Sequence, residues 1–180
     1  MIKEVLLNKI FKQDKRVKSL MDVKVSDLIE LGIKAITLDA DNTSSYDGTT
    51  TPLPGASEWI QNVKENGIKV ILLSNASMKR IKLLADQYDV LAIGIALKPL
   101  PFGYLRAVIK LRLNPSEICM IGDQLFTDIM GANLIGMKTI YCNPVALEKR
   151  KLVSFKIKRY LEDKIFKMQE EKQKEHGDAE

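Results

Sequence analysis

The chain has 180 residues, of which 46% are hydrophobic and 28% are charged, and its formal net charge is +5. This length suits a single folded domain with an ordinary hydrophobic core. Two cysteines are too few for a disulfide framework, and no stretch approaches the roughly 18 consecutive apolar residues that span a membrane. The N-terminal stretch also lacks the pattern of a signal peptide, so we expect a cytoplasmic protein in which both thiols are buried.

The positive charge is concentrated at the two ends of the chain. Residues 1–18 contain six Lys or Arg against two acids, and residues 149–167 contain eight against two. The middle has no basic stripe with interleaved aromatic residues, so we expect no nucleic-acid partner. The basic ends are compatible with a peripheral contact to an anionic membrane surface, and the sequence is also compatible with a homo-oligomer.

We expect an N-terminal helical segment over residues 1–33 that packs on a core over residues 34–148. Within this core, apolar runs of strand length alternate with amphipathic segments of helix length. The runs are continuously apolar, as is typical of strands buried on both faces of a parallel sheet. The predicted strands are Ala35–Asp39, Val70–Ser74, Leu91–Ala96, Ile118–Gly122 and Thr139–Cys142. The predicted helices are Ala56–Glu65, Met78–Gln87, Gly103–Leu113 and Thr127–Leu134. This succession predicts an open, doubly wound parallel α/β sheet with five core strands.

Residues 149–180 predict a basic C-terminal helix followed by a frayed polar tail. Apolar residues recur in this segment at helical spacing between lysines. They are Val153, Ile157, Leu161, Ile165 and Met168. Two interpretations stay open: a last helix that packs on the sheet, or a surface that also meets anionic lipid headgroups. The only histidine, His176, lies in the polar tail, so we do not expect a histidine base.

Polar residues follow each of the first four predicted strands. They are Asp39 and Asp41, then Ser74 and Asn75, then Lys98, and finally Asp123 and Asp128. Because ligands of open α/β sheets bind outside the carboxyl ends of the strands, we expect these side chains to share one site.

The order of these residues indicates phosphoryl transfer. A carboxylate such as Asp39 can attack phosphorus and form an acyl-phosphate, which divides one difficult step into two. Asp41 could protonate the leaving oxygen and later take a proton from the hydrolytic water. Ser74 and Lys98 could hold the phosphoryl oxygens. The sequence therefore predicts catalytic roles for Asp39, Asp41 and Lys98, with Ser74, Asn75 and Lys98 binding substrate.

The carboxylates also predict a metal site. Asp39 and Asp123 could ligate one Mg²⁺, a hard cation that prefers oxygen ligands. Asp128 could ligate the ion or orient the other ligands from behind. Such an ion would let an anionic carboxylate approach an anionic phosphate.

Four segments in this order resemble the haloacid dehalogenase (HAD) superfamily of phosphatases. They are AITLDADNT at 35–43, ILLSN at 71–75, LKP at 97–99 and MIGDQLFTD at 120–128. The amino-acid sequences of the first and last segments are most similar to those of the YqeG-like group of subfamily IIIA. The resemblance implies a Rossmann-like core and adds the backbone carbonyl of Asp41 to the Mg²⁺ ligands. This sequence departs from the group at Ala40 and Ser44, where the group usually has larger apolar residues. The resemblance therefore does not predict how loop 44–54 packs.

The intervals from Asp41 to Ser74 and from Ser74 to Lys98 are short. Neither could hold the cap domain that many HAD enzymes insert above the site, so we expect no cap domain and an open site. The resemblance implies hydrolysis of a phosphomonoester, with phosphatidylglycerophosphate as a substrate through eukaryotic relatives of the group. The alternatives are a soluble sugar or nucleotide phosphate, or a non-catalytic scaffold that keeps the fold. A signalling receiver is disfavoured, because its phospho-acceptor would follow the third strand.

Overall fold

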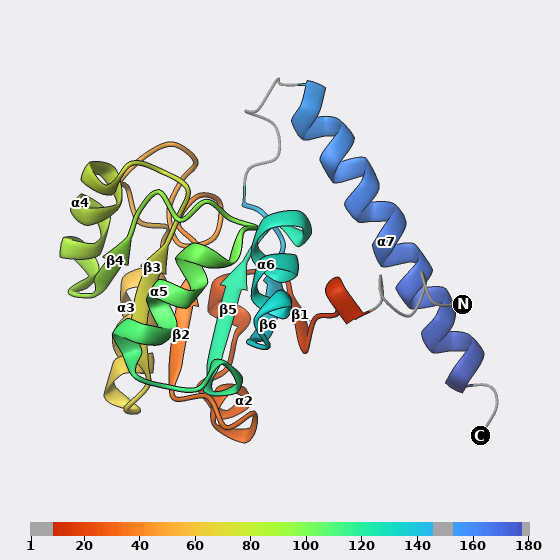
Figure 1. Ribbon diagram of the computed structural model, residues 1–180, viewed down its shortest axis with the longest axis horizontal. Coiled ribbons are helices and arrows are strands. Elements are labelled where there is room, and N and C mark those ends of the chain that lie inside the picture. The colour runs from red at the N-terminus through yellow and green to blue at the C-terminus, as the bar shows by residue number, and fades with distance from the viewer. Residues whose placement is uncertain (1–8, 146–152, 178–180) are drawn as a thin grey trace.

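The computed structural model describes residues 9–145 and 153–177, and its centre is a parallel sheet of six strands (Figure 1). The strand order is β1-β6-β5-β2-β3-β4. The strands are β1 Lys15–Val17, β2 Ala35–Leu38, β3 Lys69–Leu73, β4 Leu91–Ile93, β5 Ile118–Gly122 and β6 Lys138–Cys142. The central strands β2 and β5 are buried at every position, which explains their continuous apolar sequence. The prediction of a doubly wound parallel α/β sheet is confirmed.

Strand β1 was not predicted, because residues 1–33 were expected to be helical. Lys15–Val17 pairs in parallel with Ile140–Cys142 of β6. Just before it, the Asp14 amide donates to the carbonyl of Thr139, and the Thr139 amide donates to the Asp14 carboxylate, both at 2.9 Å. A short edge strand of sequence KRV contains no apolar run from which it could be predicted. Its extended conformation is stabilised by pairing with β6.

Helices cover both faces of the sheet. They are α2 Val25–Glu30, α3 Ala56–Glu65, α4 Met78–Tyr88, α5 Pro101–Leu111, α6 Met130–Leu134 and α7 Val153–Gly177. Two 3₁₀ turns, η1 Leu20–Asp22 and η2 Pro115–Glu117, and a π-helical turn, η3 Leu125–Ile129, complete the described elements. One core cluster joins the sheet to α2, α3 and α4, and a second joins the other face to α5 and α6.

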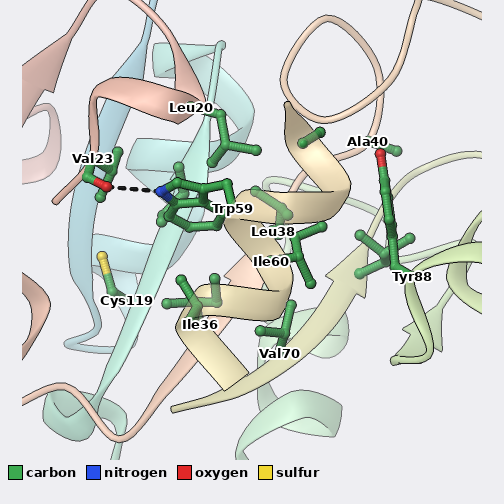
Figure 2. Close-up of a cluster of buried hydrophobic side chains, with 14 of the residues drawn as sticks. Leu20, Val23, Ile36, Leu38, Ala40, Trp59, Ile60, Val70, Tyr88 and Cys119 are labelled. Carbon is green, nitrogen blue, oxygen red and sulfur yellow. Dashed lines mark hydrogen bonds between the residues drawn. The ribbon is translucent and has the colours of Figure 1, made fainter. Parts of the chain in front are cut away.

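Figure 2 shows the first of these clusters, in which α3 packs on β2 and β3. Its largest side chain, Trp59, is anchored by a hydrogen bond of 2.7 Å from its indole nitrogen to the carbonyl of Val23. The same face buries Cys119, and both cysteines are buried and free, as expected.

The long helix α7 stands at the side of the sheet near β1 and β6 (Figure 1). It docks through Phe166, whose ring meets that of Tyr141 edge to face at 4.9 Å. Three members of the predicted apolar stripe do not face the core, since Ile157, Leu161 and Met168 are 44–55% exposed. The buried positions are instead Glu162 and Phe166, with Ile165 half-buried. The side chain of Val153 and the boundary at residues 148 and 149 lie outside the described residues. No helix within the described ranges is long and apolar enough to cross a membrane.

Candidate active site

The carboxyl ends of β2, β4 and β5 bring the predicted nucleophile, lysine and acidic residues together. The Lys98 ammonium lies 2.5 Å from Oδ1 of Asp39 and 2.6 Å from Oδ1 of Asp128. All three side chains are buried, so the two ion pairs are shielded from solvent. The structure therefore assembles three residues that are separated by 59 and 30 positions in the chain.

Burial dominates the electrostatics of this cluster. It raises the pKa of Asp39 well above its usual value, against the opposing effect of Lys98, and the nearby Asp128 and Asp123 raise it further. Burial also opposes the charge on Lys98, but the carboxylates of Asp128 and Asp39 outweigh it and raise the pKa of the lysine. Lys98 is thus a fixed cation. The ionised form of Asp39 would be stabilised by any additional positive charge nearby.

Three carboxylates fit a divalent cation. Donor oxygens of Asp39, Asp123 and Asp128 lie within 4.8 Å of one another. Oδ2 of Asp39 and Oδ1 of Asp123 are buried and have no hydrogen-bond partner among the described residues. Burial, opposed by Arg159, raises the pKa of Asp123 to about 7. An all-oxygen set with buried oxygens still open is what a hard cation such as Mg²⁺ requires, so these residues fit a metal ion.

Asp128 reaches the cluster because the chain makes a π-helical turn over Leu125–Ile129. This turn replaces the start of the regular helix that was predicted over residues 127–134, and such turns occur frequently at functional sites. Gly122, at the end of β5, leaves room for the side chain, since a Cβ atom there would overlap the Asp128 carboxylate. The amide of Gln124 donates to Oδ2 of this carboxylate at 3.1 Å.

Asn75 holds the backbone of Lys98 from both sides. Its side-chain oxygen accepts from the Lys98 amide at 2.7 Å, and its side-chain nitrogen donates to the Lys98 carbonyl at 3.0 Å. The predicted substrate contact of Asn75 stays a prediction, while the structure gives it a positioning contact. Ser74 is buried at the end of β3, and its hydroxyl accepts from the amide of Ala76 at 3.1 Å. The N-cap of α4 is Ser77.

Asp41 lies beside the cluster and is held by an arginine that the sequence analysis did not single out. Arg80 of α4 donates from both terminal nitrogens to the two oxygens of Asp41, at 2.8 and 2.6 Å. The amide of Gly48 adds a hydrogen bond of 2.8 Å to Oδ1. This contact raises the pKa of Arg80, chiefly through the hydrogen bond to Asp41. Arg80 lies in the first turn of α4, and nothing in the single sequence indicates that it faces the site.

The hydroxyl-rich loop after Asp41 supports the strand that carries the nucleophile. The Ser44 hydroxyl donates to the carbonyl of Asp39 at 2.9 Å, and the Ser45 hydroxyl donates to the carbonyl of Ala40 at 3.1 Å. The phenol of Tyr88 in α4 donates to the Ser44 carbonyl at 2.5 Å. These hydrogen bonds account for the small hydroxyl residues Ser44 and Ser45, because each hydroxyl binds a backbone carbonyl of the segment that carries the nucleophile.

The C-terminal helix α7 also reaches the site, which the sequence analysis did not foresee. Arg159 donates to the Asp123 carbonyl at 2.5 Å, to Glu162 at 2.7 Å, and pairs with Oδ2 of Asp123. Glu162 in turn accepts from the amide of Leu125, at the start of the turn that carries Asp128, at 2.9 Å. Two charged side chains of α7, the partly buried Arg159 and the buried Glu162, therefore support the acidic pair after β5.

The expected absence of an inserted domain holds for the connections that flank the nucleophile strand. Within the described residues, only α3 lies between β2 and β3, and only α4 lies between β3 and β4.

Comparisons with known proteins agree with this geometry. The profile of the haloacid dehalogenase-like hydrolases matches residues 6–136. The chain is 36% identical to the probable phosphatase YqeG of Bacillus subtilis over 78% of this chain and 82% of that protein. It is 26% identical to the mitochondrial phosphatidylglycerophosphatase of Saccharomyces cerevisiae, over 68% of this chain and 78% of that protein.

A solved structure shares the fold. An uncharacterized protein from Listeria monocytogenes superposes with a TM-score of 0.54 at 19% identity, covering 68% of this chain and 87% of that one. The family match extends over most of the sequence, and it includes the strand ends where Asp39, Lys98 and Asp123 lie. The chain therefore belongs to the haloacid dehalogenase-like hydrolase family, among its phosphatases related to YqeG.

Proposed function

We propose that the chain is a Mg²⁺-dependent phosphohydrolase that cleaves a phosphomonoester through an aspartyl-phosphate on Asp39. The observation that carries this proposal is the buried cluster in which Lys98 bridges Asp39 and Asp128. Lys98 occupies Oδ1 of Asp39, and Oδ2 is the buried oxygen without a partner among the described residues. One oxygen is thus oriented while the other is open to react or to bind a cation.

In the first step an Asp39 oxygen forms a bond to phosphorus and the bond from phosphorus to the leaving oxygen breaks. Asp41 gives a proton to that leaving oxygen, which departs as an alcohol. In the second step water attacks the phosphoryl group, Asp41 takes the proton from this water, and inorganic phosphate leaves the regenerated Asp39. Lys98 and the Ser74 hydroxyl stabilise the charge on the phosphoryl oxygens during both steps.

The pair between Asp41 and Arg80 adds a condition to this scheme. Arg80 engages both oxygens of Asp41, so the pair has to open before Asp41 can carry a proton to the leaving group. An arginine released at that point would face an entering phosphate, which its planar group binds well. Arg80 is thus proposed to position Asp41 before substrate binds.

Asp39, Asp123 and Asp128, with the backbone carbonyl of Asp41, are the residues proposed to hold Mg²⁺. The ion would neutralise charge between the attacking carboxylate and the phosphate. The chain's own contribution is to keep Oδ1 of Asp123 open by binding its other oxygen with Arg159.

Phosphatidylglycerophosphate is the substrate that we propose first. Support comes from the yeast relative, which is named a phosphatidylglycerophosphatase, and from the basic ends of the chain. A soluble sugar or nucleotide phosphate is the second candidate, since no inserted domain restricts access within the described core. A non-catalytic scaffold is disfavoured, because Asp39, Asp41 and Lys98 are all present.

Phosphate release tests the proposal directly. The purified protein would be assayed with phosphatidylglycerophosphate, sugar phosphates and nucleotides, each with Mg²⁺ and with EDTA. We expect Mg²⁺-dependent turnover that Asp39→Asn abolishes, while Asp163→Asn, which alters an exposed acid of α7, retains it. Equal rates for wild type and Asp39→Asn on every substrate would refute the nucleophile, and turnover of soluble phosphates alone would reject the lipid substrate.

A further inference from the structure

Helix α5 carries an exposed row of large apolar side chains. Phe102 is 58% exposed, Leu105 is 42% exposed and Ile109 is 75% exposed. Spacings of three and four residues place them along one side of the helix. The opposite side, with Tyr104, Ala107 and Leu111, is buried against the sheet. The core of this molecule therefore uses one side of α5 and leaves a second apolar side in solvent.

The loop before α5 continues this row toward the candidate active site. Ile95, Leu97 and Leu100 are 50–56% exposed. They alternate with buried Ala96 and Lys98, because the backbone is left-handed at Ile95 (φ 48°) and Leu97 (φ 58°). Such a conformation is strained for a β-branched residue and tends to persist at functional sites.

The loop and the helix form one continuous surface. Gly103, in the first turn of α5, packs so closely on Ala96 that a Cβ atom would overlap the backbone there. We call the exposed set the α5 face, and its residues are Ile95, Leu97, Leu100, Phe102, Leu105 and Ile109. Lys98, which binds Asp39, lies in the middle of the loop that contributes half of this face.

The charged side chains within the segment that forms the α5 face are all positive. No Asp or Glu occurs from Val90 to Ser116, whereas Arg106, Lys110 and Arg112 are exposed on α5 and just after it. Two copies that met through this face by two-fold symmetry would bring like charges together, which is unfavourable. An anionic surface is complementary to it, and apolar side chains flanked by Lys and Arg are typical of helices that lie in a membrane interface.

We propose that the α5 face docks the protein on an anionic phospholipid bilayer, with α5 in the interface and the Lys98 loop at the level of the lipid phosphates. This inference rests on the proposed phosphatase function and specifies where its lipid substrate would be met. It also moves the membrane contact away from the C-terminal helix. There the exposed Ile157, Leu161 and Met168 are accompanied by the exposed acids Asp163, Glu170 and Glu171.

Vesicle flotation tests the docking surface without requiring catalysis. Phosphatidylcholine vesicles with and without phosphatidylglycerol would be mixed with wild type and with Phe102→Ser/Ile109→Ser. The matched control is Ile29→Ser/Leu83→Ser, because these side chains are 54–56% exposed on α2 and α4, elsewhere on the molecule. We expect binding to anionic vesicles that high salt weakens, and a loss of about tenfold or more in the α5 variant only. Melting temperatures would show that each variant is folded.

Several results would overturn the proposal. One is equal vesicle binding by wild type and the α5 variant, and another is loss of binding only in Ile157→Ser/Leu161→Ser. A dimer in light scattering that the α5 variant dissociates, without vesicle binding by wild type, would assign the face to a second copy. The two proposals can fail separately. If the wild type binds anionic vesicles but releases no phosphate from any substrate, the phosphatase proposal is rejected and the docking surface is retained.

Discussion

Asp41 and Arg80 form the residue-scale contact that most directly links local geometry to the proposed chemistry. Arg80 donates hydrogen bonds to both carboxylate oxygens of Asp41. The two side chains are 15–22% exposed, so the ion pair is neither fully buried nor fully solvated. A lysine at the same position would keep the charge but lose the fork that makes two parallel hydrogen bonds.

We therefore expect Arg80→Lys to lower kcat on the order of tenfold, because Asp41 would be less well placed for proton transfer. KM should change less than kcat, provided that Arg80 acts through Asp41. Steady-state kinetics on a soluble phosphomonoester would measure both, with Lys82→Met on the same helix as the control. A pure KM effect would instead show that Arg80 binds substrate.

Gly122 is a second residue-scale feature with a testable consequence. A methyl group there would overlap the Asp128 carboxylate, which lies between Lys98 and the amide of Gln124. We expect Gly122→Ala to displace Asp128, to lower the free energy of unfolding by about 1–3 kcal/mol and to weaken metal binding. Chemical denaturation and Mg²⁺ titration would measure the two effects. Gly32→Ala is a comparison for the loss of a glycine, since nothing lies within 4 Å of a Cβ there, although its left-handed backbone adds strain of its own. Unchanged Mg²⁺ affinity in Gly122→Ala would contradict the proposed role of Asp128.

The residues of the motif segments could be predicted from the sequence, but the side chains that hold them in place could not. Asp39, Lys98 and Asp128 follow strands, so their meeting is dictated by the parallel sheet. Arg80 and Arg159 instead reach the site through the rotation of helices, and a single sequence does not reveal which of many exposed-looking arginines turns inward. Asn75 lies beside Lys98, and its contacts with the Lys98 backbone depend on a loop conformation that no periodicity encodes.

At the scale of elements, α7 is a structural part of the site and not only a cover for the sheet. The side chain of Arg159 is 13% exposed and lies between Asp123 and Glu162, which are almost fully buried. Removing the arginine would leave two buried carboxylates without this cation, a change that is far more costly than loss of a surface pair.

We expect Arg159→Met to lower the free energy of unfolding by roughly 3 kcal/mol. Lys156→Met, which removes an exposed charge one turn earlier on the same helix, should have little effect. Chemical denaturation in EDTA would compare the two. Equal stability of both variants would mean that Arg159 does not stabilise Asp123 and Glu162 as described.

The elements also differ in how well they could be predicted. Helix α3 begins and ends at the predicted residues, because its apolar positions face one side throughout. Strand β4 ends at Ile93, earlier than predicted, since the backbone turns left-handed at Ile95. Of the apolar stripe predicted in α7, Ile157, Leu161 and Met168 are exposed, because the side of the helix that carries Arg159 and Glu162 faces the fold. Amphipathic patterns describe apolar docking and miss docking through ion pairs.

At the scale of the whole molecule, the site concentrates negative charge inside the fold. Asp39, Asp123, Asp128 and Glu162 are buried with only Lys98 and Arg159 as the cations that contact them among the described residues. Burying a charge that is not fully compensated costs free energy, and the raised pKa values of Asp39 and Asp123 are expressions of that cost. A bound divalent cation would therefore stabilise the entire fold, because the carboxylates converge only when the sheet is formed.

We expect Mg²⁺ to raise the melting temperature of the wild type, by about 5–10 °C at roughly a hundred times its Kd, which corresponds to about 2.7 kcal/mol. Asp123→Asn should lose most of this shift, since it removes one of the three carboxylates that converge. The exposed Asp163→Asn should keep it, because a general ionic effect on the protein would act on both variants alike. The measurement requires no substrate, so it tests the metal site independently of the phosphatase reaction. A shift that is equal in wild type and Asp123→Asn would place the ion elsewhere, and the buried carboxylates would then have to be balanced by protons.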